Sequence, residues 1–454
     1  MNLHAKLKAR GEAGRPVRVG VIGAGKFGAM FLAQARRTAG LHVVAIADQK
    51  PGQAAAAALA VGWPAEQLEA ASPVAARDAG TTHCGEDALA LLATAGLEVV
   101  IDATGQPAAG IRHALAAIGN GLHMVMVNVE ADVLAGPLLA RRARQADLVY
   151  SLAYGDQPAL IAEQVDWART AGLEVVCAGK GTKYRPSYHR STPETVWQHY
   201  GLTPEHAARS GMNPKMFNSF LDGTKSAIEM AAVANATGLK PQPSGLHFPP
   251  AAAEDLAGLL RPREIGGILD HEGTVEVVSC VDWESGEFVP GHIRYGVFVA
   301  FKAADEYVSR CFQDYGLVTD ATGRYSALWR PYHLIGLELG ISVASAALRG
   351  EPTGAAIGFG GDVAATAKRA LKAGEVLDGE GGFTVYGRLT SAETSLDRGL
   401  LPLGLAHGVR LRRDLPEDAV LTYDDVVLDQ ADPALRFRRE MEAAFRQEGL
   451  AAAE

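Results

Sequence analysis

Apolar runs alternate with amphipathic stretches through the first third of the chain. The apolar runs are typical of buried strands and lie at residues 17–22, 42–47, 97–105 and 123–127. The stretches between them are typical of helices, among them 54–60 and 108–119. Because strands and helices alternate, the pattern predicts an α/β fold with a doubly wound parallel sheet over residues 1–160.

The pattern changes further along the chain. Two more apolar runs, 148–153 and 173–178, predict strands, and a basic loop follows the second. Beyond about residue 215 there are a predicted helix at 218–236, proline-rich connectors, and β-branched or aromatic segments at 275–281, 294–301 and 307–312. An apolar helix over 334–348 is expected to return to the core. This mixture predicts an α+β substrate and oligomerisation domain over residues 161–362.

The last part of the chain forms a third predicted unit, residues 363–454. A helix is expected over 364–377, and Ala-Gly-Glu-Val-Leu and Pro-Glu-Asp-Ala-Val-Leu-Thr-Tyr-Asp-Asp-Val both pair a turn with a short strand. Residues 365–428 thereby resemble the SAF domain, a small β-clip module found behind sugar-acid dehydratases and sialic-acid synthases. A polar, alanine-rich helix with a frayed end is expected over 430–454.

A glycine motif joins the first predicted strand to its helix. The sequence Val-Gly-Val-Ile-Gly-Ala-Gly-Lys-Phe-Gly places Gly23, Gly25 and Gly28 in a Gly-x-Gly-x-x-Gly turn around Lys26 and Phe27. In that pattern the glycines allow a tight turn, the approach of a diphosphate, and close helix packing. Asp48 ends the next strand, 20 residues beyond Gly28 (48 − 28 = 20), where a carboxylate can accept ribose hydroxyls. The motif predicts an NAD or NADP site, and the alternative is a glycine-rich turn of another α/β domain.

The residues near this motif do not distinguish NAD from NADP as the cofactor. Asp48 favours NAD because its charge repels a 2′-phosphate, whereas Lys50 can receive that phosphate from NADP.

The length, net charge and cysteine content of the chain limit the kinds of molecule that it is expected to bind. The 454 residues exceed what one core supports, so two or three domains are expected, and the net charge of −9 argues against nucleic acid or an anionic membrane. A small anionic substrate remains compatible with local basic clusters. The four cysteines show neither disulfide nor zinc spacing. No signal peptide and no membrane span are expected, which favours a cytoplasmic location.

Polar residues follow several predicted strands, where ligands of doubly wound sheets bind. Thr104, Gly105 and Pro107 are expected to line the nicotinamide ribose, and Asn128 follows the strand 123–127. Glu130 is a candidate general acid or base; alternatively, it favours a helix dipole together with Asp132. Asp156 is a further polar residue at a strand end.

Two clusters of charge follow later in the chain. Lys180, Lys183 and Arg185, with His189 close behind, suit a clamp for a phosphate or carboxylate, although a solvated basic loop would look the same. On the helix predicted over 218–236, the spacing of 4, 3 and 4 places four polar residues on one face: Asn218, Asp222, Lys225 and Glu229. An exposed, ion-paired helix face is the alternative to a functional stripe there. Asn213 precedes this helix as a further candidate substrate ligand.

Taken together, these segments resemble the homoserine-dehydrogenase-like oxidoreductases, and in particular the branch that carries a C-terminal SAF domain. That branch includes the DXR-like reductoisomerases, which convert 1-deoxy-D-xylulose 5-phosphate to 2-C-methyl-D-erythritol 4-phosphate with NADPH in isoprenoid biosynthesis. Two departures from homoserine dehydrogenases stand out: Val129-Glu130 replaces an Asn-Lys dipeptide, and Lys225 and Glu229 exchange the charges of an Asp and a Lys.

The resemblance implies roles for the candidates. Lys180, Lys183 and Arg185 would grip the substrate phosphate, and Lys225 would polarise a carbonyl. Proton transfers would fall to Glu130, Asp156 and Glu229. A divalent metal is compatible but not indicated, and a homo-oligomer is expected. Two alternatives stay open: oxidation of a hydroxy acid or sugar acid in the manner of homoserine dehydrogenase, and a non-catalytic module that senses dinucleotides.

Overall fold

The computed structural model describes residues 2–451, and side chains as far as residue 447. The chain forms two compact units. The first comprises the chain up to Leu160 together with Leu334–Ile357, and the second comprises Ile161–His333 with the chain from Gly358 onward. Among the described residues, no helix is both long and apolar enough to cross a membrane.

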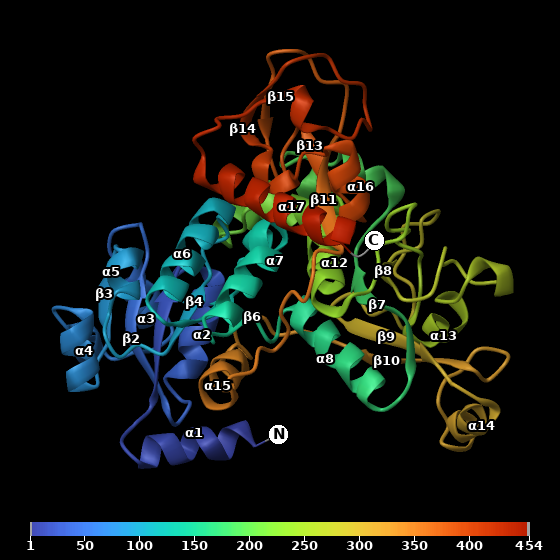
Figure 1. The fold of residues 1–454 in the computed structure, drawn as a ribbon. Helices are drawn as coiled ribbons and strands as arrows, with labels where there is room; N and C mark the ends of the chain where they lie inside the picture. Colours follow the sequence, from blue (N-terminus) through green and yellow to red (C-terminus); the bar gives the residue numbers. More distant parts are fainter. Residues whose placement is uncertain (1, 452–454) are drawn as a thin grey trace. The chain divides into compact units, whose positions relative to one another are not determined.

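The first unit is built on a six-stranded parallel sheet in the order β3-β2-β1-β4-β5-β6 (Figure 1). This order confirms the predicted doubly wound sheet, whose crevice lies where the strand order reverses, beside β1 and β4. The strands are β1 (Val17–Ile22), β2 (Leu41–Ala47), β3 (His83–Gly85), β4 (Val99–Asp102), β5 (His123–Met126) and β6 (Tyr150–Leu152).

Helices cover both faces of this sheet. One face carries α2 (Lys26–Ala35), α3 (Gln53–Ala60) and α15 (Gly340–Arg349), and the other carries α5 (Ala88–Leu92), α6 (Pro107–Gly119) and α7 (Val129–Gln145). Burial on both faces explains why the strands are almost continuously apolar. The remaining helices of this part are α1 (Leu3–Glu12), α4 (Pro73–Ala79) and the start of α8 (Gln157–Thr170).

The returning segment packs into the first core as predicted. Leu339 and Val343 are fully buried in the same cluster as Val19 and Phe31. The helix itself begins at Gly340, six residues later than the sequence pattern predicts.

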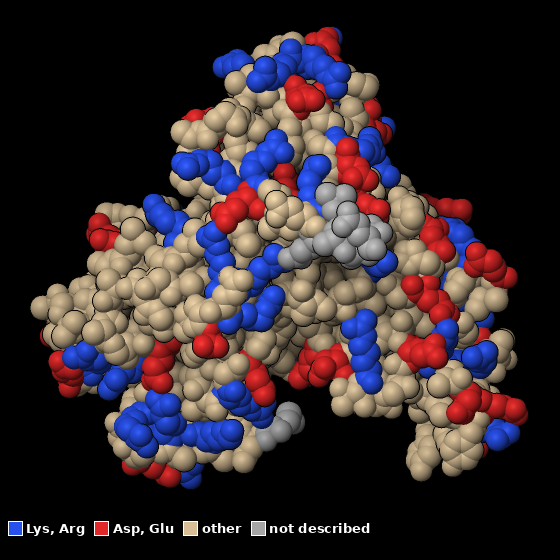
Figure 2. Space-filling model, in the orientation of Figure 1, with Lys and Arg blue, Asp and Glu red and all other residues tan. Residues whose placement is uncertain are grey.

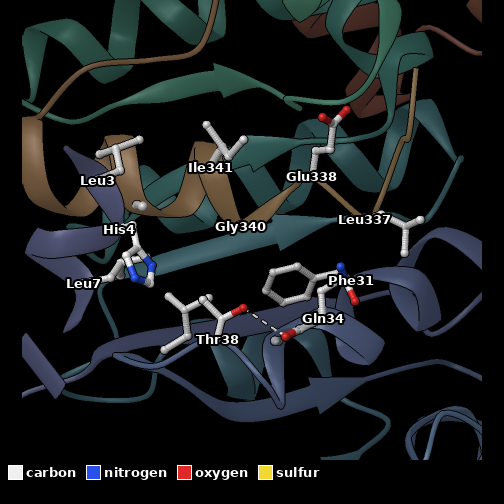
Figure 3. A pocket seen from close by; sticks show the side chains of 13 residues that line it. Leu3, His4, Leu7, Phe31, Gln34, Thr38, Leu337, Glu338, Gly340 and Ile341 are labelled. Carbon is white, nitrogen blue, oxygen red and sulfur yellow. Dashed lines mark hydrogen bonds between the residues drawn. The ribbon is translucent and has the colours of Figure 1, made fainter. Parts of the chain in front are cut away.

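A cavity of about 300 Å³ lies where α1, the C-terminal half of α2 and the start of α15 with the residues before it meet. Figure 3 shows that apolar side chains such as Leu3, Phe31 and Ile341 line it together with polar ones, among them His4, Gln34 and Glu338. The glycine turn precedes the opposite end of α2, so this cavity is not the predicted dinucleotide site.

The second unit contains a four-stranded mixed sheet in the order β10-β9-β7-β8, in which only β7 and β8 are parallel. Its strands are β7 (Glu174–Thr182), β8 (Thr274–Ser279), β9 (Val297–Lys302) and β10 (Tyr325–Arg330). The helices are α9 (Val196–Tyr200), α10 (Pro204–Arg209), α11 (Pro214–Leu221), α12 (Thr224–Thr237), α13 (Leu256–Leu259) and α14 (Glu306–Asp314).

Two of the three β-branched or aromatic segments coincide with strands β8 and β9, but residues 307–312 lie in α14. Asp305 caps that helix by accepting a hydrogen bond from the Val308 amide at 2.9 Å. A capped amphipathic pattern therefore overrides the weak strand preference of the individual residues.

The C-terminal part of the second unit forms two small antiparallel sheets, β11-β13 and β12-β14-β15. The elements are β11 (Gly361–Ala367), β12 (Val376–Asp378), β13 (Val385–Ser391), α16 (Ala392–Arg398), β14 (His407–Leu411), β15 (Val426–Val427) and α17 (Pro433–Ala451). The fold confirms the predicted β-rich module, and α17 confirms the terminal helix as far as residue 451. Residues 452–454, at the end of the predicted helix with its frayed end, lie outside the described residues.

The helix predicted over 364–377 is wrong. This segment forms β11, which pairs along its whole length with β13, followed by a turn and β12. Every residue of β11 is buried. Alanine has the highest helix propensity of any residue, but the differences amount to less than about 1 kcal/mol per residue, and the pairing of seven residues with a distant strand outweighs them.

Charged side chains of both signs are interspersed over the face of the molecule drawn in Figure 2. The net charge of −9 therefore does not form a single acidic field on that face. Local pairs and clusters decide the electrostatics of each site.

Candidate active site

The glycine turn of the first unit has the geometry of a diphosphate cradle. Gly23 adopts φ +95°, and a Cβ there would lie 2.7 Å from the Ala103 carbonyl. A Cβ on Gly28 would lie 2.2 Å from the Gly23 oxygen, so this glycine lets α2 approach the turn. Gly25 differs, because nothing lies within 4 Å of the position of its missing Cβ.

The first turn of α2 leaves amide groups for a ligand. Gly25 is the N-cap and offers no side chain to accept from the exposed N–H groups of the helix. Lys26 is exposed and Phe27 is half-buried beside this open space. The residues present therefore fit a dinucleotide diphosphate, which would accept hydrogen bonds from these amides at the positive end of the helix dipole.

Asp48 connects the turn to the end of β2. Its carboxylate accepts hydrogen bonds from the Ala24 amide at 2.8 Å and the Lys50 amide at 3.0 Å. Each oxygen keeps a further lone pair for a ribose hydroxyl. The Lys50 side chain is exposed next to this carboxylate.

A buried polar network occupies the ends of β4 and β5. Asp102 accepts from the Thr104 hydroxyl at 2.7 Å and pairs with His113 at 2.6 Å. Asn128 caps α7, and its amide donates to the Thr104 hydroxyl at 3.2 Å and to the Gln106 carbonyl at 2.9 Å. Asn128 therefore holds this loop against the start of α7. Gly105 is exposed at φ +64°, and Pro107 begins α6.

The acidic candidates of the first unit lie at helix N-termini. Glu130 and Asp132 are both in the first turn of α7, which agrees with the alternative that they favour its dipole. Glu130 is half-buried, whereas Asp132 is buried and burial raises its pKa to about 7. Asp156 is buried directly before α8 and accepts from the Gln157 amide at 2.8 Å.

The first half of the predicted basic loop belongs to a strand. β7 continues to Thr182, so Lys180 lies within the sheet rather than in a loop. A Cβ on Gly179 would lie 1.7 Å from the Glu276 oxygen, and one on Gly181 would lie 2.1 Å from the Ile293 oxygen. These glycines serve close packing of neighbouring backbone and do not cradle a phosphate.

Lys180 forms a buried ion pair with Glu229 of α12. Both side chains are almost fully buried. Burying an ion pair costs desolvation energy that the pairing does not always recover, so such pairs are candidates for a functional role. Lys225 lies one helical turn before Glu229 and is half-buried.

The single helix predicted over 218–236 is wrong, because it is broken at Asp222-Gly223 into α11 and α12. Gly223 adopts φ +88°, a left-handed conformation that interrupts a right-handed helix. The 4, 3, 4 spacing therefore does not place the four predicted residues on one continuous face; only Lys225 and Glu229 share a helix.

Asn218 and Asp222 instead hold the C-terminal module. Asp222 pairs with Lys368 at 2.7 Å, and both are buried. Lys368 also donates to the carbonyls of Ser191 and Gly382, each at 2.8 Å. Asn218 donates to the carbonyls of Ser191 and Gly381, each at 3.0 Å.

His189 belongs to an aromatic cluster above Asp222. Its Nδ1 lies 3.1 Å from the Asp222 carbonyl, which can only accept, so Nε2 accepts from the Tyr184 hydroxyl at 2.5 Å. Burial lowers the pKa of His189, which favours this neutral form. The ring stacks on Tyr386 with centroids 4.6 Å apart.

The other predicted substrate ligands have separate surroundings. Arg185 donates to the Trp283 carbonyl at 2.5 and 3.1 Å, and Asn213 is the exposed N-cap of α11. Lys183 donates to the His199 carbonyl. The structure thus brings Lys180 together with Glu229, and it gives Lys183 and Arg185 different hydrogen-bond acceptors although both charges act on His199. The sequence pattern did not reveal Lys368 as the partner of Asp222, because Lys368 lies in a segment without a motif, and it assigned no role to Tyr184 although this residue lies within the basic loop.

Among the side chains that the structure describes, no group of three or more His, Cys, Asp or Glu is placed to hold a metal ion.

Three family models match successive parts of the chain. Residues 17–127 match the oxidoreductase family with an NAD-binding Rossmann fold. Residues 155–339 match the catalytic domain of oxidoreductase DRL, and residues 363–427 match the SAF domain. A search of curated proteins finds no match.

Similar solved structures cover only part of the chain. Biliverdin reductase from Synechocystis sp. PCC 6803 is 18% identical, covering 43% of this chain and 55% of its own, with a TM-score of 0.27. A myo-inositol dehydrogenase from Corynebacterium glutamicum is 13% identical, covering 40% of this chain and 48% of its own, with a TM-score of 0.27. The chain thus spans about half the length of these structures.

The matches define the class of the protein. It combines an NAD(P)-binding Rossmann domain, an oxidoreductase catalytic domain and a SAF domain, in that order. This confirms the predictions of an oxidoreductase, of NAD(P) as its cofactor, and of the SAF domain.

Proposed function

We propose that the protein is an NAD(P)H-dependent reductoisomerase acting on a small phosphorylated ketose such as 1-deoxy-D-xylulose 5-phosphate. The cradle at Gly25 carries the cofactor part of the proposal, because its open space and free helix amides suit a dinucleotide. The match of residues 155–339 to an oxidoreductase catalytic domain supports a reaction rather than dinucleotide sensing alone.

The proposed reaction has two stages. One carbon–carbon bond breaks and another forms, which leaves an aldehyde without net oxidation or reduction. NAD(P)H, when bound, supplies a hydride to the aldehyde carbon, and a general acid supplies a proton to its oxygen. The product is a primary alcohol, and the cofactor is oxidised by two electrons.

The buried charges of the second unit suit the proton transfers. Lys180 holds the Glu229 side chain in one position, and a carboxylate in a dry environment can take a proton from a substrate hydroxyl. Lys225, one turn away on α12, supplies an ammonium group that can polarise a ketone oxygen.

Turnover measurements test this proposal. We expect 1-deoxy-D-xylulose 5-phosphate to be consumed with oxidation of NADPH, followed at 340 nm, and the branched polyol phosphate to be found by mass spectrometry. Lys225→Met and Glu229→Gln should each reduce kcat by roughly 100-fold or more while NADPH binding stays unchanged. The exposed Lys372→Gln is the matched control and should keep full activity.

Two other results of the turnover measurements would favour the two alternative functions. Oxidation of homoserine or another hydroxy acid, without turnover of any ketose phosphate, would replace the proposal with the dehydrogenase alternative. Cofactor binding without turnover of ketose phosphates, sugar acids or hydroxy acids would favour the sensing module.

A further inference from the structure

Lys183 and Arg294 are two cations of the second unit without a carboxylate partner. Lys183 directly follows β7, and Arg294 lies three residues before β9. Within the part of the chain that the structure describes, neither side chain forms an ion pair; Lys183 donates to the His199 carbonyl, and Arg294 contacts aromatic rings.

Two aromatic rings are shared by these cations. The Lys183 ammonium lies 5.4 Å from the centroid of Tyr200 and 5.7 Å from that of Phe288. The Arg294 guanidinium lies 5.9 and 5.8 Å from the same two centroids. Because both cations approach the same rings, they are neighbours. Phe288 is 51% exposed, so the cluster opens to solvent.

The charges in this cluster oppose one another. Burial and the charge of Arg294 lower the pKa of Lys183. Burial and the charges of Lys183 and Arg185 lower the pKa of His199, while burial and the charge of Arg294 lower that of His292. A bound anion would remove this repulsion, because it would place negative charge among four groups that can each donate a hydrogen bond.

The backbone is shaped to bring these groups together. Gly181 of β7 donates its amide to the Gly296 carbonyl at 3.1 Å, and a Cβ on Gly181 would lie 3.1 Å from the Arg294 amide. Only glycine at this position lets the segment before β9 pack so closely on β7. The closeness of Lys183 and Arg294 is therefore fixed by the fold rather than by the free movement of surface side chains.

We propose that Lys183 and Arg294 bind the phosphate group of the substrate. The guanidinium offers paired donors to two phosphate oxygens, Lys183 offers a point charge, and Tyr200 and Phe288 provide apolar walls. The identity of the phosphate ester rests on the proposed function, whereas the anion site itself does not. Of the three basic residues that the sequence pattern assigned to the phosphate, this site retains only Lys183 and adds Arg294.

Binding of inorganic phosphate tests the site without any turnover. We expect calorimetric titration to show phosphate binding to the full-length protein saturated with NADP⁺, which occupies the cradle at Gly25. Arg294→Gln and Lys183→Gln should each weaken phosphate binding by roughly 10-fold or more, the loss typical of a charged hydrogen bond. Arg310→Gln removes an exposed arginine of α14 and should leave binding unchanged.

Three results would overturn the proposal: no phosphate binding to the NADP⁺-saturated wild type, unchanged binding to both variants, or an equal loss in Arg310→Gln. Arg294→Lys controls for a folding defect, because it keeps the positive charge but lacks the paired donors of the guanidinium. It should weaken phosphate binding less than Arg294→Gln does.

A second titration identifies the source of the phosphate. 1-Deoxy-D-xylulose 5-phosphate should displace inorganic phosphate from the wild type, and unphosphorylated 1-deoxy-D-xylulose should not. If NADP⁺ abolishes a phosphate site that depends on Arg294, the site serves the cofactor and the proposal is wrong. If phosphate binds as expected but no ketose phosphate is turned over, the anion site stands and the proposed function falls.

Discussion

Gly25 and Gly28 belong to one motif, yet the space around their α-carbons differs. Open space lies above Gly25, whereas backbone fills the position of a Cβ on Gly28. Similar contrasts affect charged residues: Lys183 lacks a carboxylate partner, while Lys180, three positions earlier, is buried against Glu229. The chemistry of a residue in this protein follows from its surroundings more than from its type.

Gly25→Val should remove dinucleotide binding without unfolding the protein. The new side chain would occupy the path of the diphosphate, and we expect roughly 100-fold weaker NADPH binding by fluorescence titration. Gly28→Ala provides the contrast, because its Cβ would clash with the Gly23 oxygen and lower the unfolding temperature. Unchanged NADPH affinity in Gly25→Val would refute the placement of the diphosphate.

Asp132→Asn should stabilise the protein at alkaline pH. Burial raises the pKa of Asp132 from an ordinary value of 3.8 to about 7, so the folded state holds a proton that the unfolded state has released. Stability from this group is complete below pH 4 and is lost as the pH rises to about 7.

Urea unfolding at pH 5 and pH 8 checks this sign. The asparagine variant should gain about 1–4 kcal/mol over wild type at pH 8, and much less at pH 5. Asp166→Asn, at an exposed position of α8, is the control and should show no such difference. A gain that is equal at both pH values would contradict the raised pKa.

At the scale of secondary-structure elements, two segments of the second unit differ from the helices that their sequence patterns predict. A glycine in the left-handed region divides the predicted helix into α11 and α12. The alanine-rich segment 361–367 becomes a strand because it pairs with β13. The first break has a local cause, the glycine itself, whereas in the second place pairing with a distant strand outweighs the local preference for a helix.

Gly223→Ala should destabilise the break between α11 and α12. An L-residue at φ +88° costs about 1–2 kcal/mol, and the Cβ itself meets only ordinary contacts at 3.4 Å. Urea denaturation should show this loss. Gly258→Ala is the matched control, because Gly258 lies in α13 with open space around it and should gain stability slightly. An unchanged midpoint in Gly223→Ala would mean that the left-handed turn is not required.

At the scale of the whole molecule, buried ion pairs integrate the SAF domain into the second unit. Lys368 on the chain after β11 pairs with Asp222, and Arg438 of α17 pairs with Asp362 of β11. Asn235 of α12 also donates to the Gly361 carbonyl at 3.1 Å. The SAF domain is therefore a structural part of the second unit rather than a tethered appendage.

Lys368→Met should destabilise the full-length protein by about 3–5 kcal/mol, because it leaves the Asp222 carboxylate buried without a counter-charge. Thermal and urea unfolding measure the loss. Adding Asp222→Asn should recover part of it by removing the buried charge. Lys372→Met, at an exposed ion pair in the same domain, should change stability by less than about 1 kcal/mol. A small loss in Lys368→Met would show that this pair does not hold the domain.

The dinucleotide-binding motif could be predicted from local sequence alone. The strand, glycine turn, helix and acid at its start lie within 32 residues (48 − 17 + 1 = 32), so local periodicity and steric limits specify them without reference to the rest of the chain. The SAF domain was also predictable from its short motifs, although its first strand was not.

The charged sites of the second unit depend on contacts between residues that are far apart in the sequence, so they became visible only in the folded structure. Lys180 and Glu229 lie 49 positions apart in the sequence. Lys183 and Arg294 are also distant in the sequence, and they become neighbours only in the folded protein, where both lie near the ring of Tyr200. The sequence does not distinguish a basic residue in a buried ion pair from one that donates a hydrogen bond to a carbonyl or one that is available to bind an anion. Its partner, and therefore its role, is fixed only when distant strands and helices pack together.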